Sequence, residues 1–422
     1  MDYVLTIFPA VLLLLGFPIF LILLSASAIL LLFFMNVPTT AVHQVMFGSV
    51  DKFALIAVPF FLFAGEIMGV GGMSRRIVEW VLALMGNLRG CRGLSTVGAC
   101  TVFGAISGSS VATIAAVGKL MYPVLREKYD ARFSAGLICA TGAIDILIPP
   151  SIAMILYGAS AEQSVALLFI AGVFPGLVMA AFQGTYVLYY ARKHNVRDGA
   201  PFSWRKVGHL SKTGFWSLGA PFVILGGIYG GIFSPTEAAG IACVYGILVC
   251  KFIYGDVTWK GLWNVAVNSM YLTAQVLIIV AAAGVFSWIL TVSGIPQQTV
   301  EIVKGFADTQ WQMLIIVNVF LLIVGCFIDP GSAILVLTPL LVPIMKAYGV
   351  DLIHFGIVMT MNLAIGMFTP PFGLNIFVTQ ALTKVSLREL YPGLVPFIIL
   401  TILALMVVTY VPWLSLYLTK FV

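Results

Sequence analysis

Charged residues are scarce in this chain of 422 residues. They make up 9% of it, against roughly 25% in an average soluble domain, whereas hydrophobic residues make up 61%. The 16 acidic and 22 basic side chains are too few to cover the surface that a water-soluble fold of this size leaves exposed. A soluble enzyme and a protein with a single membrane anchor are therefore excluded. Because a bilayer takes ~20 helical residues per crossing, the apolar runs predict an all-α polytopic membrane protein with about ten spans.

Motifs for catalysis, ATP hydrolysis and metal clusters are also missing. The six cysteines form no CxxC pair, and no histidine lies at metal-ligand spacing. The only Gly-Lys pair, Gly118-Lys119, lacks both the first glycine and the hydroxyl residue of a P-loop. Ile144 before Asp145 breaks the GxGD pattern of an intramembrane aspartyl protease. We therefore expect no enzyme, no ATP-driven importer, no organic cofactor and no nucleic-acid partner.

Two long apolar runs are interrupted near their middle. Ser107-Gly108-Ser109-Ser110 divides the run 95–122, and Asp329-Pro330-Gly331-Ser332 divides the run 312–345. Each half is too short to cross a bilayer, so both runs are predicted to form re-entrant hairpins, which are tolerated only when buried in protein or lining a cavity. In 4–35, Gly16 and Pro18 either divide two short spans or kink one long helix.

More polar segments separate the apolar runs. Residues 73–90 and 296–308 precede the two hairpins at matching places and are predicted to be amphipathic helices that lie along the membrane as arms. The longest polar stretch, 192–214, is predicted to be a cytoplasmic linker between two halves.

Basic residues are distributed unevenly across the predicted spans. No base precedes Lys52, so the apolar N-terminal stretch is expected to be a retained membrane segment. With ten spans and two hairpins, nearly all of the 22 bases fall on one face, which the positive-inside rule assigns to the cytoplasm. The exceptions are Lys52, Lys304, Lys346 and Lys420. Both termini are then predicted to lie outside.

The two halves of the sequence repeat each other. The residues Gly108, Pro123, Tyr129, Gly136 and Pro149-Pro150 recur in order as Gly331, Pro343, Tyr348, Gly356 and Pro370-Pro371. By the charge map the two hairpins enter from opposite sides, which predicts an inverted repeat. The first repeat is 1–191, with a scaffold 1–72, an arm 73–90, and a hairpin and broken helix 95–190. The second is 215–422, with a scaffold 215–291, an arm 296–308, and a hairpin and broken helix 312–418.

Inverted repeats with broken helices near the bilayer midplane are typical of secondary transporters and of their binding sites. The proline pairs cannot donate hydrogen bonds, so carbonyls in 146–148 and 366–369 are left without helical partners. Such carbonyls and nearby hydroxyls suit a hard cation such as Na⁺, and helix N-termini suit an anionic substrate. The serines at the first break and Asp329 also fit as helix caps, with or without a second role.

Several motifs together resemble a known family, the large membrane subunit (DctM type) of tripartite ATP-independent periplasmic, or TRAP, transporters. They are Pro59-Phe60-Phe61-Leu62-Phe63-Ala64-Gly65-Glu66, Phe103-Gly104-Ala105-Ile106-Ser107-Gly108-Ser109-Ser110, Ile148-Pro149-Pro150-Ser151, Pro235-Thr236-Glu237-Ala238-Ala239 and Thr369-Pro370-Pro371-Phe372-Gly373-Leu374-Asn375. The resemblance covers nearly the whole chain.

This resemblance implies an importer of small organic anions in the bacterial inner membrane, with an elevator mechanism and two Na⁺ sites. The implied partners are a small four-helix membrane subunit (DctQ type) and a periplasmic substrate-binding protein (DctP type). The candidate Na⁺ ligands are Ser107, Ser109, Ser110, Asp145, Ile148 and Pro149 at one site, and Asp329, Gly331, Ser332, Gly366, Thr369 and Gly373 at the other. The candidate substrate contacts are Ser107, Ser110, Pro150, Ser151, Ser332, Pro371 and Asn375.

Three questions stay open at the level of sequence. Asp145 stands where the family pattern favours glycine or a small residue; either a bound ion or a hairpin hydroxyl compensates its charge, or it faces a water-filled cavity. A self-contained Na⁺/dicarboxylate symporter of related architecture is the alternative function. The substrate is a sialic acid, a C4-dicarboxylate, another keto or sugar acid, or a sulfonate.

Overall fold

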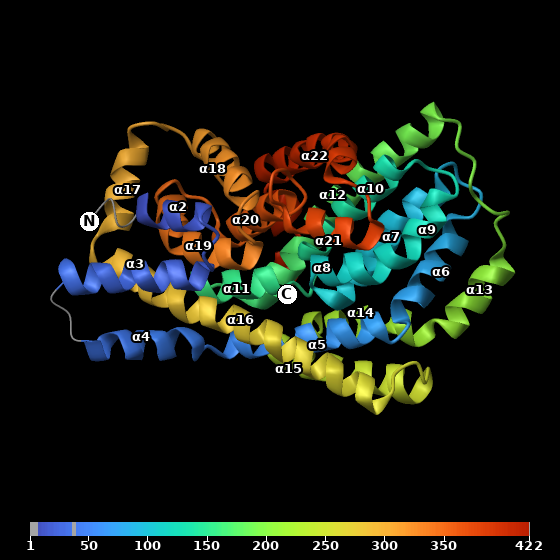
Figure 1. Cartoon of the computed structure of the whole chain (residues 1–422), viewed down its shortest axis with the longest axis horizontal. Coiled ribbons are helices and arrows are strands. Elements are labelled where there is room, and N and C mark those ends of the chain that lie inside the picture. Colours follow the sequence, from blue (N-terminus) through green and yellow to red (C-terminus); the bar gives the residue numbers. More distant parts are fainter. Residues whose placement is uncertain (1–6, 36–38, 422) are drawn as a thin grey trace.

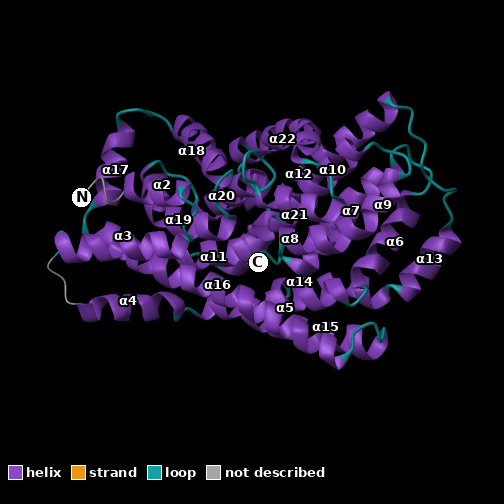
Figure 2. Ribbon diagram, viewed as in Figure 1, coloured by secondary structure: helices purple, strands orange, loops and turns teal. Residues whose placement is uncertain are grey.

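The structure is a computed structural model that describes residues 7–35 and 39–421, and these residues form helices and loops without any strand (Figure 2). The predicted all-α fold is confirmed. The part of the first apolar run that falls in residues 4–6 lies outside the described residues. Large side chains point outward from long apolar helices, for example Phe222 at 79% exposed and Trp263 at 70%. Such a surface is suited to lipid rather than to water.

The helices of the first half follow one another along the chain in this order. They are α2 (Ile7–Leu14), α3 (Ile19–Phe33), α4 (Thr39–Val50), η1 (Phe53–Ile56), α5 (Ala57–Val70), α6 (Met73–Met85), α7 (Cys91–Ser107), α8 (Ser110–Thr113), η2 (Ile114–Gly118), α9 (Lys119–Arg126), α10 (Ala131–Gly142), η3 (Ala143–Ile146), α11 (Ile152–Ala161) and α12 (Val165–Lys193). After α13 (Trp204–Thr213), the second half begins.

The second half consists of α14 (Phe215–Tyr229), α15 (Pro235–Ile247), η4 (Leu248–Ile253), α16 (Trp259–Val292), α17 (Ile295–Lys304), α18 (Gln310–Gly325), α19 (Pro330–Ala347), α20 (Leu352–Gly366), α21 (Leu374–Thr383), α22 (Leu387–Tyr410), α23 (Trp413–Leu416) and η5 (Leu418–Phe421). An arm helix, a hairpin, a broken helix and a long helix therefore follow one another in both halves. Both predicted hairpins and both predicted helix breaks are confirmed.

Contacts between the halves are reciprocal. The second limb of the first hairpin, α8 and η2, packs on α21, while the second limb of the other hairpin, α19, packs on α11. Likewise α10 packs on α22, and α20 packs on α12. Each of these contacts therefore has a counterpart in which the two halves are exchanged. A two-fold relation between the repeats produces such pairs of contacts, so the packing supports the duplication. The repeat boundaries and opposite orientations stay predictions.

Helices from both ends of the sequence build a layer beside the hairpins. Figure 1 shows α4 and α5, in blue, running along the yellow helices α15 and α16, with the hairpins and broken helices on the other side of α16. Helix α16 packs against α3, α4 and α5, and α15 packs against α5. The helices of this layer come from both ranges predicted as scaffold, 1–72 and 215–291, which are separated by more than a hundred residues. The division into domains stays a prediction.

Three details of the fold refine or correct the sequence-based prediction. Gly16, with a φ of +80°, separates α2 from α3, so the described part of this region is two helices rather than one kinked helix. Helix α4 was not predicted, because its residues alternate between polar and apolar without a long apolar run. The linker 192–214 is not a simple connection, because it contains α13, whose Ser211 hydroxyl accepts a hydrogen bond from Trp80 of α6 at 2.9 Å.

The number of spans also depends on the broken helices. Among the described residues, six helical segments have the length and apolar composition to cross a membrane alone: Phe53–Val70, Val165–Lys193, Pro235–Ile253, Trp259–Val292, Pro330–Ala347 and Leu387–Tyr410. Three of the four halves of the broken helices, α11, α20 and α21, are among the shorter apolar helices, and α10 has 12 residues. Pro330–Ala347 is a hairpin limb, so length alone does not separate such a limb from a span.

Candidate functional site

The tip of the first hairpin lies directly against the first helix break. Helix α7 ends at Ser107, and Gly108 turns the chain with a φ of +65°. A Cβ atom on Gly108 would lie 2.5 Å from the Pro150 carbonyl oxygen, so only glycine allows this approach. The Ser107 hydroxyl donates to the Ser109 carbonyl at 3.3 Å within the turn. The tip that carries Ser107, Ser109 and Ser110 therefore lies against Pro150, and a Na⁺ site formed by these serines stays a prediction.

Asp145 lies in this break and is fully buried. Thr113, on the second limb of the hairpin, donates to its Oδ2 atom at 2.5 Å. Its Oδ1 atom has no hydrogen-bond partner in the described chain, and it lies 2.9 Å from the position of a Cβ on Gly104. The alternative in which Asp145 faces a water-filled cavity does not hold in this structure. A hairpin hydroxyl is beside it instead, since α8 and η3 pack together.

Two glycines, Gly325 and Gly366, form the contact at which the second hairpin crosses the second broken helix. A Cβ atom on Gly366 would lie 2.3 Å from the Gly325 carbonyl carbon, so α18 and α20 touch backbone to backbone. Beyond the crossing, Gly373 lies against the carbonyls of Gly366 and Met367, at 2.9 Å and 2.4 Å from its Cβ position. Thr369 donates to the Ile365 carbonyl at 2.7 Å. At this break the Gly366 carbonyl accepts from the Thr369 N–H at 3.1 Å and the Met367 carbonyl accepts from the Asn375 N–H at 2.9 Å, so both have partners within the chain. A Na⁺ site at these residues stays a prediction.

Asp329 caps the helix that follows the second tip. Its Oδ2 accepts from the Ser332 backbone N–H at 3.0 Å, and its Oδ1 accepts from the Ser332 hydroxyl at 2.6 Å. Gly331 lies inside the first turn of α19, so it does not form the turn that Gly108 forms. The predicted equivalence of Gly108 and Gly331 is wrong in this respect, because the second tip turns at 326–329.

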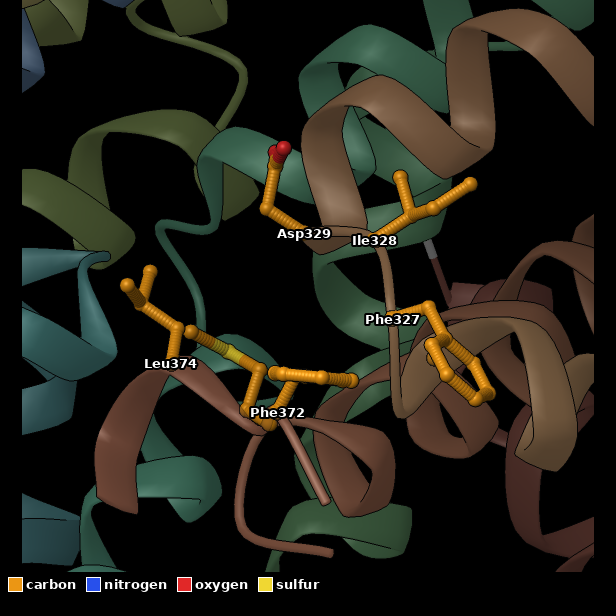
Figure 3. A pocket seen from close by; sticks show the side chains of 7 residues that line it. Phe327, Ile328, Asp329, Phe372 and Leu374 are labelled. Atoms are coloured by element: carbon orange, nitrogen blue, oxygen red, sulfur yellow. The ribbon is translucent and has the colours of Figure 1, made fainter. Parts of the chain in front are cut away.

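A cavity of about 130 Å³ adjoins the second break. Figure 3 shows Phe327, Ile328 and Asp329 on one wall, opposite Phe372 and Leu374. Asp329 is exposed, and an ionised carboxylate facing hydrocarbon costs at least ~2.5 kcal/mol. This side of the tip therefore faces water rather than lipid.

Ser110 of the first half and Asn375 of the second half form a hydrogen-bonded pair. The Ser110 hydroxyl lies 2.8 Å from Asn375 Nδ2, which donates to it, and Asn375 Nδ2 also reaches the Cys139 carbonyl at 3.3 Å. Both side chains are buried. Two residues predicted to contact substrate from different repeats are thus in direct contact.

The remaining predicted residues fall into the same two regions without forming a single cluster. Ile148 and Ser151 are buried at the first break, and Ser151 accepts from the Met154 N–H at 3.4 Å as the cap of α11. Pro371 is exposed at the second break, and its carbonyl accepts from Tyr391 at 3.1 Å. Whether any of these residues binds an ion or a substrate stays a prediction.

Sequence reasoning missed Thr113 and a buried polar chain behind the second break. In this series of hydrogen bonds, Asn362 donates to Asn318 at 2.8 Å, and Asn318 donates to the Thr409 hydroxyl at 3.1 Å. Asparagine in an apolar run was the available signal, because buried polar groups in a membrane require partners. Nothing in the sequence indicated which partners they would find.

Comparisons with known proteins agree with this architecture. Apolar helices facing outward, two hairpins and two broken helices define a multi-pass membrane protein of the transporter class. The profile described as "Tripartite ATP-independent periplasmic transporter, DctM component" matches residues 6–414. The chain therefore belongs to the DctM family of TRAP transporter components, which are transporter permeases of the inner membrane and not enzymes.

Curated relatives and a solved structure support the assignment. The chain is 40% identical over 372 residues to the C4-dicarboxylate TRAP transporter large permease protein DctM of Pseudomonas aeruginosa, covering 88% of this chain and 87% of that one. It is 38% identical over 382 residues to the isethionate TRAP transporter permease protein DctMQ of Oleidesulfovibrio alaskensis, covering 89% of this chain but only 60% of that relative's length. The fold is similar to the crystal structure of the Alcanivorax borkumensis YdaH transporter, with a TM-score of 0.56 over 98% of both chains. The two sequences are 12% identical, so this comparison shows likeness of fold alone.

Proposed function

We propose that this protein imports a small organic anion together with Na⁺ by an elevator movement. In this proposal a periplasmic binding protein delivers the anion, and a small membrane subunit completes the transporter. The observation that carries the proposal is that each hairpin tip touches the helix break of its own repeat, through Gly108 against the Pro150 carbonyl and through Gly325 against Gly366. Broken helices at such contacts supply partial charges for an ion and a substrate.

The chemistry of the first contact fits a hard cation. The buried Asp145 Oδ1 atom lacks a partner among the described residues. The Ser107 hydroxyl lies near the same carboxylate, and the Pro150 carbonyl lies against Gly108 at the tip of the hairpin. Oxygen donors of this kind suit Na⁺, and a bound cation would offset a buried carboxylate that otherwise costs several kcal/mol. At the second contact, Thr369, Gly366 and Gly373 supply the corresponding hydroxyl and backbone.

The two-layer arrangement suits a movement of one layer along the other. Gly65 of α5 lies under the first tip, where a Cβ would be 2.8 Å from the Ser107 carbonyl oxygen. Helix α16 contacts α19 of the second hairpin. The scaffold layer thus touches both hairpins, and a displacement of the hairpins along it would carry both tips across the membrane.

Uptake into proteoliposomes tests this function. The chain is reconstituted with its small subunit, and uptake of a radiolabelled C4-dicarboxylate or isethionate is measured with and without the binding protein and with an inward Na⁺ gradient. Ser107→Ala and Thr369→Ala should each raise the Na⁺ concentration for half-maximal uptake about tenfold, because a hydroxyl bonded to a charge contributes ~1.5–3 kcal/mol.

Thr185→Ala is the matched control. The Thr185 hydroxyl is exposed on α12 and donates to its own helix at 2.8 Å, so its loss should leave Na⁺ dependence unchanged. Uptake that continues without Na⁺ contradicts the coupling. Uptake that requires Na⁺ but not the binding protein favours a self-contained symporter instead.

A further inference from the structure

A second, larger cavity lies away from both helix breaks. Its volume is about 400 Å³, within the range of small-molecule pockets. One wall comes from α4, η1 and α16 of the scaffold layer, with Ser49, Lys52 and Trp288. The opposite wall comes from α11 and α19, with Ser160, Glu162 and Leu335. Helix α19 packs against α16 (Figure 1). None of these residues belongs to the predicted ion or substrate sites.

Lys52 is the basic residue that lines this cavity, and only part of its hydrogen-bonding capacity is used. Its Nζ donates to the Ala159 carbonyl in the last turn of α11 at 2.7 Å. An ammonium has three N–H donors, so two remain. Within residues 7–35 and 39–421, Lys52 forms no ion pair with a carboxylate. A half-buried ammonium with free donors beside an open cavity has the chemistry of an anion site.

The other groups on the walls complement an organic anion. Ser49, Ser160 and Ser287 bring hydroxyls, and Val280 and Leu335 bring apolar surface. Glu162 is exposed whereas Lys52 is half-buried, so the deeper charge in the cavity is positive. By the distribution of basic residues, Lys52 lies on the outer face of the membrane, where the substrate would arrive.

We propose that this cavity is an outer binding site for the carboxylate or sulfonate group of a small organic anion, held by Lys52. The proposal rests on the proposed function for the class of ligand. Because one wall is scaffold and the other carries the first broken helix and the second hairpin, relative movement of the layers would open or close the site. It therefore lies on a path to the helix breaks rather than at them.

Protection of an introduced thiol tests the site directly. Five of the six native cysteines are buried, and Cys326→Ser removes the half-buried sixth. In that background, Ser287→Cys and, separately, Ser160→Cys place a thiol on each wall. The purified protein with its small subunit is labelled with a charged thiol reagent in detergent, with choline succinate or choline isethionate as the probe and choline chloride as the ionic-strength control.

We expect both probes to slow labelling of either thiol. Lys52→Gln should raise the half-protecting concentration about tenfold, since a charge-assisted hydrogen bond is lost, whereas Lys52→Arg should keep protection. Lys346→Gln is the matched control, because this exposed base is also predicted to lie outside but does not line the cavity.

Three outcomes would overturn the proposal. The first is that neither thiol reacts, since the cavity would then be closed to water. The second is labelling that succinate and isethionate leave unchanged. The third is protection that Lys52→Gln does not weaken, even if uptake slows, since Lys52 would then only tie α11 to the scaffold. No Na⁺ is present in the assay, so failure of Na⁺-coupled uptake and failure of this site are separate results.

Discussion

The two hairpin-and-break regions have the same order of elements but opposite exposure. At the first, Asp145, Pro150 and Ser151 are buried, whereas at the second, Asp329, Pro371 and Phe372 are exposed. The first tip is thus enclosed by protein, and the second faces a water-accessible cavity. The two repeated parts of the sequence therefore form one enclosed region and one open region in the same conformation of the protein.

The two acidic residues show what this difference means. Asp145 depends on a hydroxyl from another element, Thr113, for its hydrogen bond. Asp329 depends only on its own helix, since both of its oxygen atoms accept from Ser332. A change at Asp145 is therefore expected to affect ion binding and packing, and a change at Asp329 to affect chiefly the stability of its own helix.

Cysteine reactivity should give the largest contrast between the two regions. Phe372→Cys places a thiol on the exposed wall of the cavity beside the second break, and Ser151→Cys places one at a buried cap. A water-soluble reagent should label the first and leave the second unmodified, because reaction needs an accessible thiolate. Both variants are compared by mass spectrometry in the Cys326→Ser background. Equal labelling would show that the two regions do not differ in exposure.

The tip glycines should differ almost as strongly. Gly108→Ala adds a methyl group at positive φ and within 2.5 Å of the Pro150 carbonyl, so uptake should fall by at least about tenfold. Gly331→Ala adds a methyl group inside a helix, with its nearest neighbours at 3.2 Å, and should retain most of the uptake. Uptake rates and thermal unfolding of both variants check this. A tolerated Gly108→Ala would contradict the close approach at the first tip.

Neutralising Asp145 should change the Na⁺ dependence of uptake more than neutralising Asp329. Asp145→Asn keeps the shape and the Thr113 contact, so the protein should remain folded while the Na⁺ concentration for half-maximal uptake rises about tenfold, or ~1.4 kcal/mol. Asp329→Asn keeps a helix cap and should change Na⁺ dependence less. The comparison is made at one pH in the same liposomes. A larger effect at Asp329 would reverse the assignment of the charged ligand.

Loss of the cap at the second tip should have the smallest effect. Asp329→Ala leaves the first turn of α19 without its acceptor and should reduce stability by ~1 kcal/mol. The measurement is the midpoint of unfolding in detergent, with Asp329→Asn as the variant that retains a cap. A loss much larger than this would mean that Asp329 has contacts beyond its own helix.

Much of the fold was accessible from the sequence because it follows from local patterns. Ser107-Gly108-Ser109-Ser110, Asp329-Pro330-Gly331-Ser332 and the two Pro-Pro pairs disfavour a continuous helix, so both hairpins and both breaks were predicted. The second tip turns at 326–329, slightly before the predicted place. The more polar composition of 73–90 and 296–308, at matching places before the two hairpins, likewise predicted α6 and α17. Helix α4 and the helix in the linker escaped prediction, because short polar helices depend on the partner against which they pack.

The sequence by itself determined that this protein lies in a membrane, that its halves repeat and that its helices break at two equivalent places, since composition and backbone chemistry act locally. Only the tertiary structure decided that Thr113 bonds Asp145, that Ser110 meets Asn375 across the repeats and that Lys52 reaches the end of α11. These pairs are separated by 32, 265 and 107 positions. Contacts over such separations depend on how whole helices pack, and packing selects one partner among the many that a local pattern allows.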